Sequence, residues 1–346
     1  MLKVVFSRYH HSYLGVKRLP NILKPEMPQL KWGKSNQFEG WYFKLVDASE
    51  TNAVAVIPGV SFGANEAESH CFVQVLDGRT RQPHYFSFPL DAFNSDDKQF
   101  RISIQDNEFR MDGIELHLKD SQHKITGSLQ LGESIPWPVS RFTPGAMGPF
   151  RFIPRMQCLH GILSFDHAIQ GTLTIDGRII DFSDGRGYTE KDWGHEFPSA
   201  WIWMQSNHFD EPGVSFTSSI ANIPWLNRSF TGFLIGLLYD GTVYRFTTYN
   251  RAKISSPQVS GDAVTFTVHN KKFAIEVDAH RAPGASLRSP VEGLMTGRII
   301  ESLDSLIHLK FYSTEKSRKD IFFEGTGRNA GLEIVGDLAD IGAIQT

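Results

Sequence analysis

Residues 185–207, GRGYTEKDWGHEFPSAWIWMQSN, bring acidic side chains and tryptophans close together in the sequence. The acidic and histidine residues are Glu190, Asp192, His195 and Glu196, and the tryptophans are Trp193, Trp201 and Trp203. A carboxyl group that is partly buried beside indole rings has a raised pKa and can stay protonated near neutrality. Such a group is a general acid, worth roughly 10²–10⁴-fold in rate. Tryptophan faces stabilise a nearby cation by roughly 0.5–2 kcal/mol each. Protonating an alkene and sheltering the carbocation would require this combination.

The local structure expected here would bring these groups to one side. Asp184-Gly185 and the GRGY that includes this glycine predict a turn, and a strand is expected from Ser199 onward. One face of that strand would carry Trp201, Trp203, Gln205 and Asn207. Aromatic surface that ends in two amides suits the wall of a ligand cavity. The alternatives are tryptophans that only fill a core, and carboxylates that pair with Arg186 and Lys191 to brace a loop.

A second stretch with an acid among aromatic residues is QFEGWYFKLVD, residues 37–47. In a strand, Glu39 and Trp41 point to one side and Tyr42 to the other. A glutamate that shares a face with aromatic rings lies either at the rim of a cavity or inside it, and Gly40 would let a backbone or a ligand approach closely. The alternative is a barrel strand in which Trp41 plugs one end and Glu39 pairs with an arginine.

Other catalytic and metal-binding arrangements receive less support. The histidines show no HExxH motif and no His/Cys spacing typical of zinc, so no metal site is expected. Cys158 and His160 are two residues apart, which on a strand places them on one face, as a thiol nucleophile would need. No P-loop, GxGxxG or GxSxG motif is present. Glu190 or Asp192 could serve a glycosidase, but the neighbouring surface is hydrocarbon and aromatic rather than suited to sugar hydroxyls.

The composition is typical of a soluble globular protein. The 346 residues include 26 Phe, 30 Gly and 17 Pro, and the net charge of −3 gives no reason to expect nucleic acid as a partner. The two cysteines, Cys71 and Cys158, are expected to be reduced thiols. The N-terminal residues contain only a four-residue apolar run, too short for a signal peptide or a membrane span. We therefore expect a cytoplasmic protein, with transient membrane contact near Lys17 and Arg18 left open and no oligomeric state indicated.

Alternating hydrophobic and polar residues predict a mainly antiparallel β protein. FRISIQDNEF, GIELHLKD and VTFTVHNKKFAIEV alternate with period two, and Asp176-Gly177 and Asp240-Gly241 are hairpin signals. The only candidates for a short helix are residues 299–306 and the C-terminus. Residues 133–156 hold five prolines among aromatic residues. They are expected to form a packed crossover between an N-terminal β half, 1–132, and a C-terminal β half, 157–346.

Several separated motifs resemble those of the tocopherol cyclase family. They are FEGWYFK near the N-terminus, the GPF and M-x-C-x-H-G stretch that contains His160, and GRGYTEKDWG followed by FP and W-x-W-x-Q-x-N. The resemblance runs from about Phe38 to the C-terminal GTGRNAGLEIVGD. The motif positions are held by Glu39, Trp41, Tyr42, Tyr188, Glu190, Lys191, Asp192, Trp193, Trp201, Trp203, Gln205 and Asn207.

The resemblance implies a lipocalin-like, antiparallel β-barrel or sandwich with two β halves around an apolar cavity. It also implies closure of a chromanol ring on a prenylated hydroquinone, without redox chemistry and without a cofactor. More distantly, the family is similar to lipocalin-like hydratases and cyclases that act on carotenoids and polyketides.

Together, the two arguments give a mechanism for the expected cyclase. A buried acid protonates the trisubstituted alkene of the prenyl chain; Asp192 is the first candidate, Glu190 the second and Glu39 the third. The residues expected to contact the substrate are Trp41, Tyr42, His160, Tyr188, Trp193, Trp201, Trp203, Gln205 and Asn207. The ring hydroxyl then attacks the cation and loses its proton to the carboxylate or to His195. The alternatives are a non-catalytic carrier of a hydrophobic isoprenoid or lipid, and an isoprenoid hydratase or pericyclase.

Overall fold

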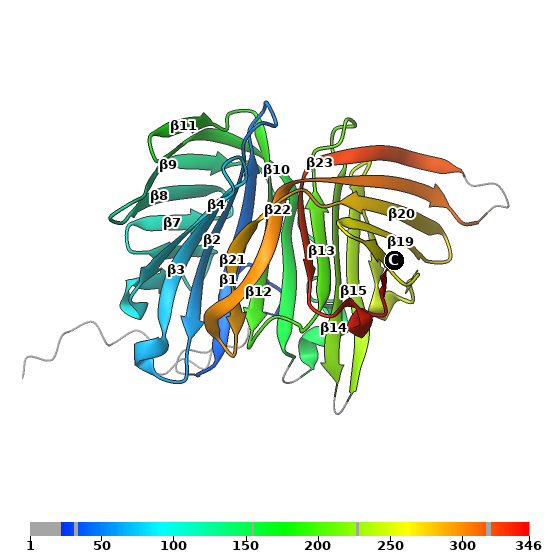
Figure 1. The fold of residues 1–346 in the computed structure, drawn as a ribbon, viewed down its shortest axis with the longest axis horizontal. Coiled ribbons are helices and arrows are strands. Elements are labelled where there is room, and N and C mark those ends of the chain that lie inside the picture. Colours follow the sequence, from blue (N-terminus) through cyan, green and yellow to red (C-terminus); the bar gives the residue numbers. More distant parts are fainter. Residues whose placement is uncertain (1–21, 31–33, 154–155, 226–227, 316–319, 346) are drawn as a thin grey trace, which may run out of the picture.

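The chain folds into two β-sheets that lie side by side (Figure 1). The computed structural model describes residues 22–30, 34–153, 156–225, 228–315 and 320–345. Each sheet has twelve strands, and every strand pair among these residues is antiparallel except β18 with β24. Within the described residues, neither series of paired strands returns to its first strand, so the architecture is two open sheets rather than a closed barrel.

The first sheet contains all strands up to residue 194. In spatial order it consists of β4 (Gln82–Phe88), β3 (His70–Asp77), β2 (Ala53–Phe62), β1 (Gln37–Val46), β12 (Gly185–Gly194), β10 (Cys158–Ile175), β9 (Lys124–Leu131), β8 (Gly113–Lys119), β7 (Asn107–Arg110), β6 (Arg101–Ile104) and β5 (Phe93–Ser95), with β11 (Arg178–Asp181) paired to β10. Chain neighbours are mostly sheet neighbours, as short hairpin connections dictate.

The second sheet begins at Trp201. Its order is β16 (Thr242–Thr247), β15 (Arg228–Tyr239), β14 (Ser215–Trp225), β13 (Trp201–Ser206), β23 (Ile321–Val335), β22 (Leu294–Ser313), β20 (Phe273–His280), β19 (Ala263–His269), β18 (Gln258–Ser260) and β24 (Ile344–Gln345), with β17 (Lys253–Ile254) paired to β19 and β21 (Ala285–Val291) paired to β22. The described helices are all short 3₁₀ turns: η1 (Glu66–Glu68), η2 (Leu90–Ala92), η3 (Gly148–Phe152), η4 (Thr248–Asn250) and η5 (Leu338–Ile341).

Hydrophobic residues gather in three clusters, one within each sheet and one between them. Strand alternation on β1 shows how the first sheet serves two of these clusters. Trp41 and Phe43 pack into the sheet's own core, while Tyr42 belongs to the cluster between the sheets. Trp201 and Trp203 on β13 meet that same middle cluster from the second sheet. The interface between the sheets is therefore partly hydrophobic core, and it contains the candidate site.

Two local predictions are wrong. The expected turn at GRGY is part of strand β12, which pairs with β1 on one side and β10 on the other; the turn ends at Asp184, whose φ is 60°. A Cβ at Gly187 would lie 2.4 Å from His167 Nε2, so any larger residue there would have to displace the His167 ring. The short helix considered for residues 299–306 is part of strand β22, in which alternate side chains are buried and exposed.

The proline-rich segment 133–156 connects β9 to β10 within the first sheet, and the chain passes from the first sheet to the second through residues 195–200. Trp137 in this segment is buried and stacks on Phe165, with ring centroids 6.0 Å apart. Phe142 is exposed. The segment is therefore held to the protein by part of its aromatic content.

Candidate active site

A cavity lies between the facing sides of the two sheets. Its empty space is about 1290 Å³, a figure that includes open solvent at its mouth. The first sheet contributes side chains from β1, β2, β3, β10 and β12, and the second from β13, β14, β15, β22 and β23. The apolar lining includes Phe38, Ile57, Phe72, Phe197, Trp201 and Trp203.

Four carboxyl groups line this mostly apolar space: Glu190, Asp192, Glu301 and Glu333. The first two are on β12, two residues apart, so strand alternation turns both toward the second sheet. Glu301 is on β22 and Glu333 on β23, where it is the direct cross-strand partner of Trp203 on β13. The acids thus come from both sheets and converge between them.

The Glu190 carboxyl is surrounded by buried hydrogen-bond donors. Its Oε2 accepts hydrogen bonds from Tyr188 Oη at 2.6 Å and from Trp203 Nε1 at 3.1 Å, and lies 3.6 Å from His160 Nε2. Burial raises the pKa of Glu190 to about 7; the positive charge of His160 opposes this rise and the negative charge of Asp192 adds to it. Glu190 can therefore hold and release a proton near neutral pH.

Glu301 and Glu333 are held in a similar way by aromatic side chains. Tyr42 Oη donates to Glu301 Oε1 at 2.5 Å, and Trp201 Nε1 donates to Glu333 Oε2 at 2.6 Å. Burial raises the pKa of Glu301 to about 8, with the charge of Glu190 adding to the effect. Burial, reinforced by the charge of Glu301, raises the pKa of Glu333 well above its ordinary value. Glu301 is therefore predominantly a neutral acid at pH 7, and burial favours the neutral form of Glu333 in the same way.

Asp192 forms an ion pair with His160. The Asp192 Oδ1 and His160 Nδ1 atoms are 2.9 Å apart. Burial by itself lowers the pKa of His160, but the charges of Asp192 and Glu190 outweigh burial and raise it to about 9. Cys158 also lines the cavity, and burial together with the Asp192 charge raises the pKa of its thiol well above the ordinary value. Cys158 therefore lacks the thiolate character that a nucleophile requires.

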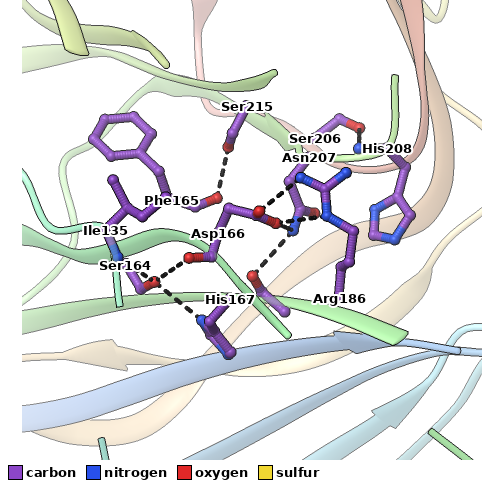
Figure 2. A network of polar contacts seen from close by, with 11 residues as sticks. Ile135, Ser164, Phe165, Asp166, His167, Arg186, Ser206, Asn207, His208 and Ser215 are labelled. Carbon is purple, nitrogen blue, oxygen red and sulfur yellow. Dashed lines mark hydrogen bonds and ion pairs between the residues drawn. The ribbon is translucent and has the colours of Figure 1, made fainter. Parts of the chain in front are cut away.

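Beyond the tryptophans, the two sheets are joined by polar contacts. Lys44 Nζ donates to Gln205 Oε1 at 2.7 Å, and Asn207 Nδ2 donates to Asp166 Oδ1 at 2.9 Å and to the Gly187 carbonyl at 3.0 Å. Figure 2 shows the Asp166 carboxylate between the Asn207 amide and the Arg186 guanidinium, which donates to both of its oxygens. This network fixes β13 against β10 and β12, and so sets the distance between the indoles and the carboxyls.

An irregularity in strand β10 provides a further contact between the two sheets. The register of β10 against β12 shifts on both sides of Ser164, and the carbonyl of the next residue, Phe165, accepts a hydrogen bond from Ser215 Oγ of the second sheet at 2.7 Å (Figure 2). A bulge frees a backbone group from its ladder and makes it available for such a contact.

Comparison with known proteins identifies the family of the chain. The model of tocopherol cyclase-like proteins matches residues 137–336, which include β12, β13, β22 and β23. The chain belongs to the tocopherol cyclase-like family. The family assignment confirms what the sequence motifs predicted.

Two curated plant proteins are similar over part of the chain. The probable chloroplastic tocopherol cyclase of Oryza sativa subsp. japonica is 29% identical over 155 residues, 43% of this chain and 32% of that protein. The chloroplastic tocopherol cyclase of Zea mays is 27% identical over 211 residues, 56% of this chain and 42% of that protein. The match thus spans less than half the length of either plant protein.

Solved structures share the fold at low sequence identity. The crystal structure of CghA with Sch210972 has a TM-score of 0.57 and 10% identity, covering 93% of this chain and 94% of CghA. Kievitone hydratase from Nectria haematococca has a TM-score of 0.50 and 11% identity, covering 91% and 92%. The predicted all-β, lipocalin-like fold is therefore confirmed. Identities this low carry no information on the substrate.

Several residues that this family's motifs single out lie away from the cavity. Glu39 is on the other face of β1 from Tyr42 and forms an ion pair with Lys191 at 2.5 Å; its carboxylate also accepts the backbone N–H groups of Gln29 and Leu30. The Lys191 ammonium lies over the rings of Trp41 and Trp193, 4.5 and 5.0 Å from their centroids. These four motif residues form a buried structural cluster, because alternation along β1 and β12 turns them away from the second sheet.

The remaining predicted residues divide between the cavity and its surroundings. Tyr42, His160, Trp201 and Trp203 line the cavity, and Tyr188 lies behind Glu190 as its hydrogen-bond donor. Gln205 and Asn207 share the face of the tryptophans but bond to the first sheet instead. His195 is exposed and its Nδ1 lies 2.7 Å from the Asn36 carbonyl, so its position does not support a role as proton acceptor.

Glu301 and Glu333 were not anticipated from the sequence. In β22, Glu301 falls on the same face as Met295 and Ile299, and an acid on the apolar face of a strand is the signal that would have identified it. The helix considered for this stretch hides that pattern. Glu333 follows Leu332 in a short apolar run, and only the pairing of β23 with β13 brings it to the tryptophans.

His160, Glu190 and Asp192 are also close enough together to be considered as ligands of a metal ion. His160, Glu190 and Asp192 each offer a ligand atom, and these atoms lie within 4.8 Å of one another. In the structure they already pair with one another and with Tyr188 and Trp203. We therefore treat them as a proton-transfer group.

Two further observations concern membranes. Among the described residues, the helices are all too short to cross a lipid bilayer. Lys17 and Arg18, considered above for membrane contact, lie outside the described residues.

Proposed function

We propose that this protein is an acid-catalysed cyclase that closes an oxygen ring on a prenylated hydroquinone. The observation that supports this most strongly is the Glu190 carboxyl, with a pKa of about 7, in an apolar cavity lined by Trp201 and Trp203. Protonation of an alkene needs an acid that is shielded from water. It also needs a cavity lining that stabilises the resulting carbocation. Membership of the tocopherol cyclase-like family supports the choice of substrate class.

The reaction begins with proton transfer from Glu190 to the less substituted carbon of the alkene. A C–H bond forms there, and positive charge develops on the tertiary carbon. The faces of Trp201 and Trp203 stabilise that charge by roughly 0.5–2 kcal/mol each. The carboxylate left on Glu190 is stabilised by the hydrogen bonds from Tyr188 and Trp203 to Oε2.

Ring closure completes the cycle without a net change in protons. The phenol oxygen attacks the tertiary carbon, so a C–O bond forms as the O–H bond breaks. The released proton returns to the Glu190 carboxylate, and the substrate and the product are isomers. No cofactor takes part in these steps.

Glu301 and Glu333, whose neutral forms burial favours, are the groups we assign to the polar head group. A protonated carboxyl in an apolar site donates a hydrogen bond, and the hydroquinone oxygens are acceptors. Tyr42 and Trp201 fix the orientation of the two acids. In this arrangement the ring lies near Glu301 and Glu333, and the prenyl chain follows the apolar lining.

The test is incubation of the full chain with a prenylated hydroquinone in D₂O. The expected product is the isomeric chromanol with one deuterium on the carbon next to the new C–O bond, detected by mass spectrometry and NMR. A product heavier by one water would instead identify a hydratase. Bound substrate that is recovered unchanged would refute catalysis and support a carrier of hydrophobic ligands, which the apolar lining would also suit.

A further inference from the structure

A second cluster of ionisable side chains lies in the first sheet, away from the cavity. His84 is on β4, His123 is in the turn between β8 and β9, and Asp176 is in the hairpin turn between β10 and β11. Each residue offers one ligand atom, and these atoms all lie within 4.8 Å of one another. None of the three lines the cavity described above. The three residues are tens of positions apart in the sequence, so the cluster cannot be recognised from a sequence motif.

His84 is buried without a hydrogen-bond partner for one ring nitrogen. Its exposed fraction is 3%, and among the described residues its Nδ1 finds no donor or acceptor. The ring meets that of His123 nearly edge to face, with centroids 4.4 Å apart and planes at 73°. A buried imidazole nitrogen normally has a hydrogen-bond partner. An unpaired nitrogen beside a second imidazole is therefore available to bind a metal ion.

The surroundings are negatively charged and already oriented. Asp176 Oδ1 accepts a hydrogen bond from the Lys124 backbone N–H at 2.8 Å, and Asp176 Oδ2 lies 2.8 Å from His123 Nδ1. The carboxylates of Asp77 and Asp120 also act on the His84 ring. Asp120 in turn accepts the backbone N–H of His123 at 2.7 Å and so fixes the turn that carries it. Such outer contacts orient ligands before a metal binds.

We propose that His84, His123 and Asp176 bind a divalent transition-metal ion, with Zn²⁺ the best match. Two imidazoles and one carboxylate are a common zinc donor set, whereas Mg²⁺ and Ca²⁺ prefer oxygen ligands throughout. The fourth position is left for water. Zn–N and Zn–O bonds of about 2.0–2.2 Å require the ligand atoms to close on the ion by about an ångström. The His123–Asp176 hydrogen bond is replaced by two metal bonds.

The bound ion would connect parts of the sheet that share no strand pairing. In the part of the chain that the structure describes, β4 is an edge strand that pairs only with β3, while the other two ligands belong to turns on the far side of β1 and β12 in the strand order. A metal that binds only the folded chain raises its stability in proportion to its occupancy. The site is therefore structural, and it is independent of the proposed cyclase chemistry.

The experiment uses the full chain, freed of metal with a chelator, and titrates it with Co²⁺ and then Zn²⁺. One tetrahedral Co²⁺ per chain, seen by its visible absorption and displaced by Zn²⁺, is expected for wild type. Asp176→Asn and His84→Gln are expected to weaken binding at least tenfold and to abolish the rise in Tm that Zn²⁺ gives the wild type. Asn tolerates the φ of 48° at position 176, so that variant keeps its turn.

The matched control is Asp240→Asn, because Asp240 occupies the same hairpin position with the same φ of 48° in the second sheet. It should bind Co²⁺ like the wild type. Binding that is equally tight in Asp176→Asn, His84→Gln and the control would overturn the proposal. So would octahedral Co²⁺ alone, or the absence of any Zn²⁺-dependent change in Tm.

Discussion

Replacing Glu190 with glutamine removes the proposed proton donor and keeps its shape. The amide oxygen can still accept the hydrogen bonds that Tyr188 and Trp203 donate to the carboxylate. A general acid is worth roughly 10²–10⁴-fold in rate, so kcat for chromanol formation is expected to fall by that factor. KM should change little, because the apolar lining that holds the prenyl chain is untouched.

The pH dependence of the wild type gives a second measure of the same group. Because the pKa of Glu190 is about 7, its protonated fraction falls from about nine-tenths at pH 6 to about one-hundredth at pH 9. The acid is the reactive form, so kcat/KM is expected to be level below pH 6 and to fall about tenfold per unit above pH 8.

The assay measures conversion of the hydroquinone to its isomer by chromatography, at a series of pH values and substrate concentrations. Glu211→Gln, an exposed glutamate in the loop after β13, is the control and should behave as wild type. A Glu190→Gln variant with wild-type kcat would refute the assignment. A wild-type profile that stays level to pH 9 would refute the pKa argument separately.

Three further outcomes are expected. Tyr188→Phe removes a hydrogen bond that lowers the pKa of Glu190, so the alkaline limb of the kcat/KM profile should move to higher pH. Trp201→Leu should lower kcat by about 2- to 30-fold if its ring face supplies roughly 0.5–2 kcal/mol to the cation, with kcat and KM determined separately. The stability that Glu190 and Glu301 contribute should fall as pH rises, measured as the difference between wild type and Glu190→Gln. Glu190 and Glu301 have pKa values of about 7 and 8 in the folded chain, raised above the ordinary 4.5, so their contribution is complete below about pH 4.5 and is lost through pH 7–8. Urea denaturation should record this loss, on the order of 1 kcal/mol per pH unit for each carboxyl.

The fold could be predicted where a strand has one solvent-exposed face and one buried face. Period-two alternation marks FRISI and GIELHLK correctly, because their odd and even side chains face different environments. It fails in GRGYTEKDWG, where the strand is buried on both faces and acids lie on one of them. The glycines there reflect close contact with neighbours such as His167 rather than a turn.

The site could be predicted only in part, for a related reason. Sequence shows that Glu190, Asp192, Trp201 and Trp203 lie near one another along the chain, and all four line the cavity. It does not show which face of β1 turns to the second sheet, so the sequence groups Glu39 with them, although Glu39 pairs with Lys191. Acids supplied by distant strands, and clusters such as that of His84, depend on sheet packing that no local pattern encodes.

Glu190 and Asp192 show how partners rather than residue type decide chemical roles. The two carboxyls are on one face of one strand and line one cavity, yet Asp192 Oδ1 is 2.9 Å from a charged imidazole whereas Glu190 faces phenol and indole donors. Burial alone would push the pKa of Glu190 upward and make it a poor acid for an alkene. The His160 charge, which Asp192 sustains, opposes that push and keeps the value near 7. In the proposed mechanism Asp192 is a positioning residue that tunes the donor through His160, and Glu190 is the carboxyl whose pKa lies near neutrality.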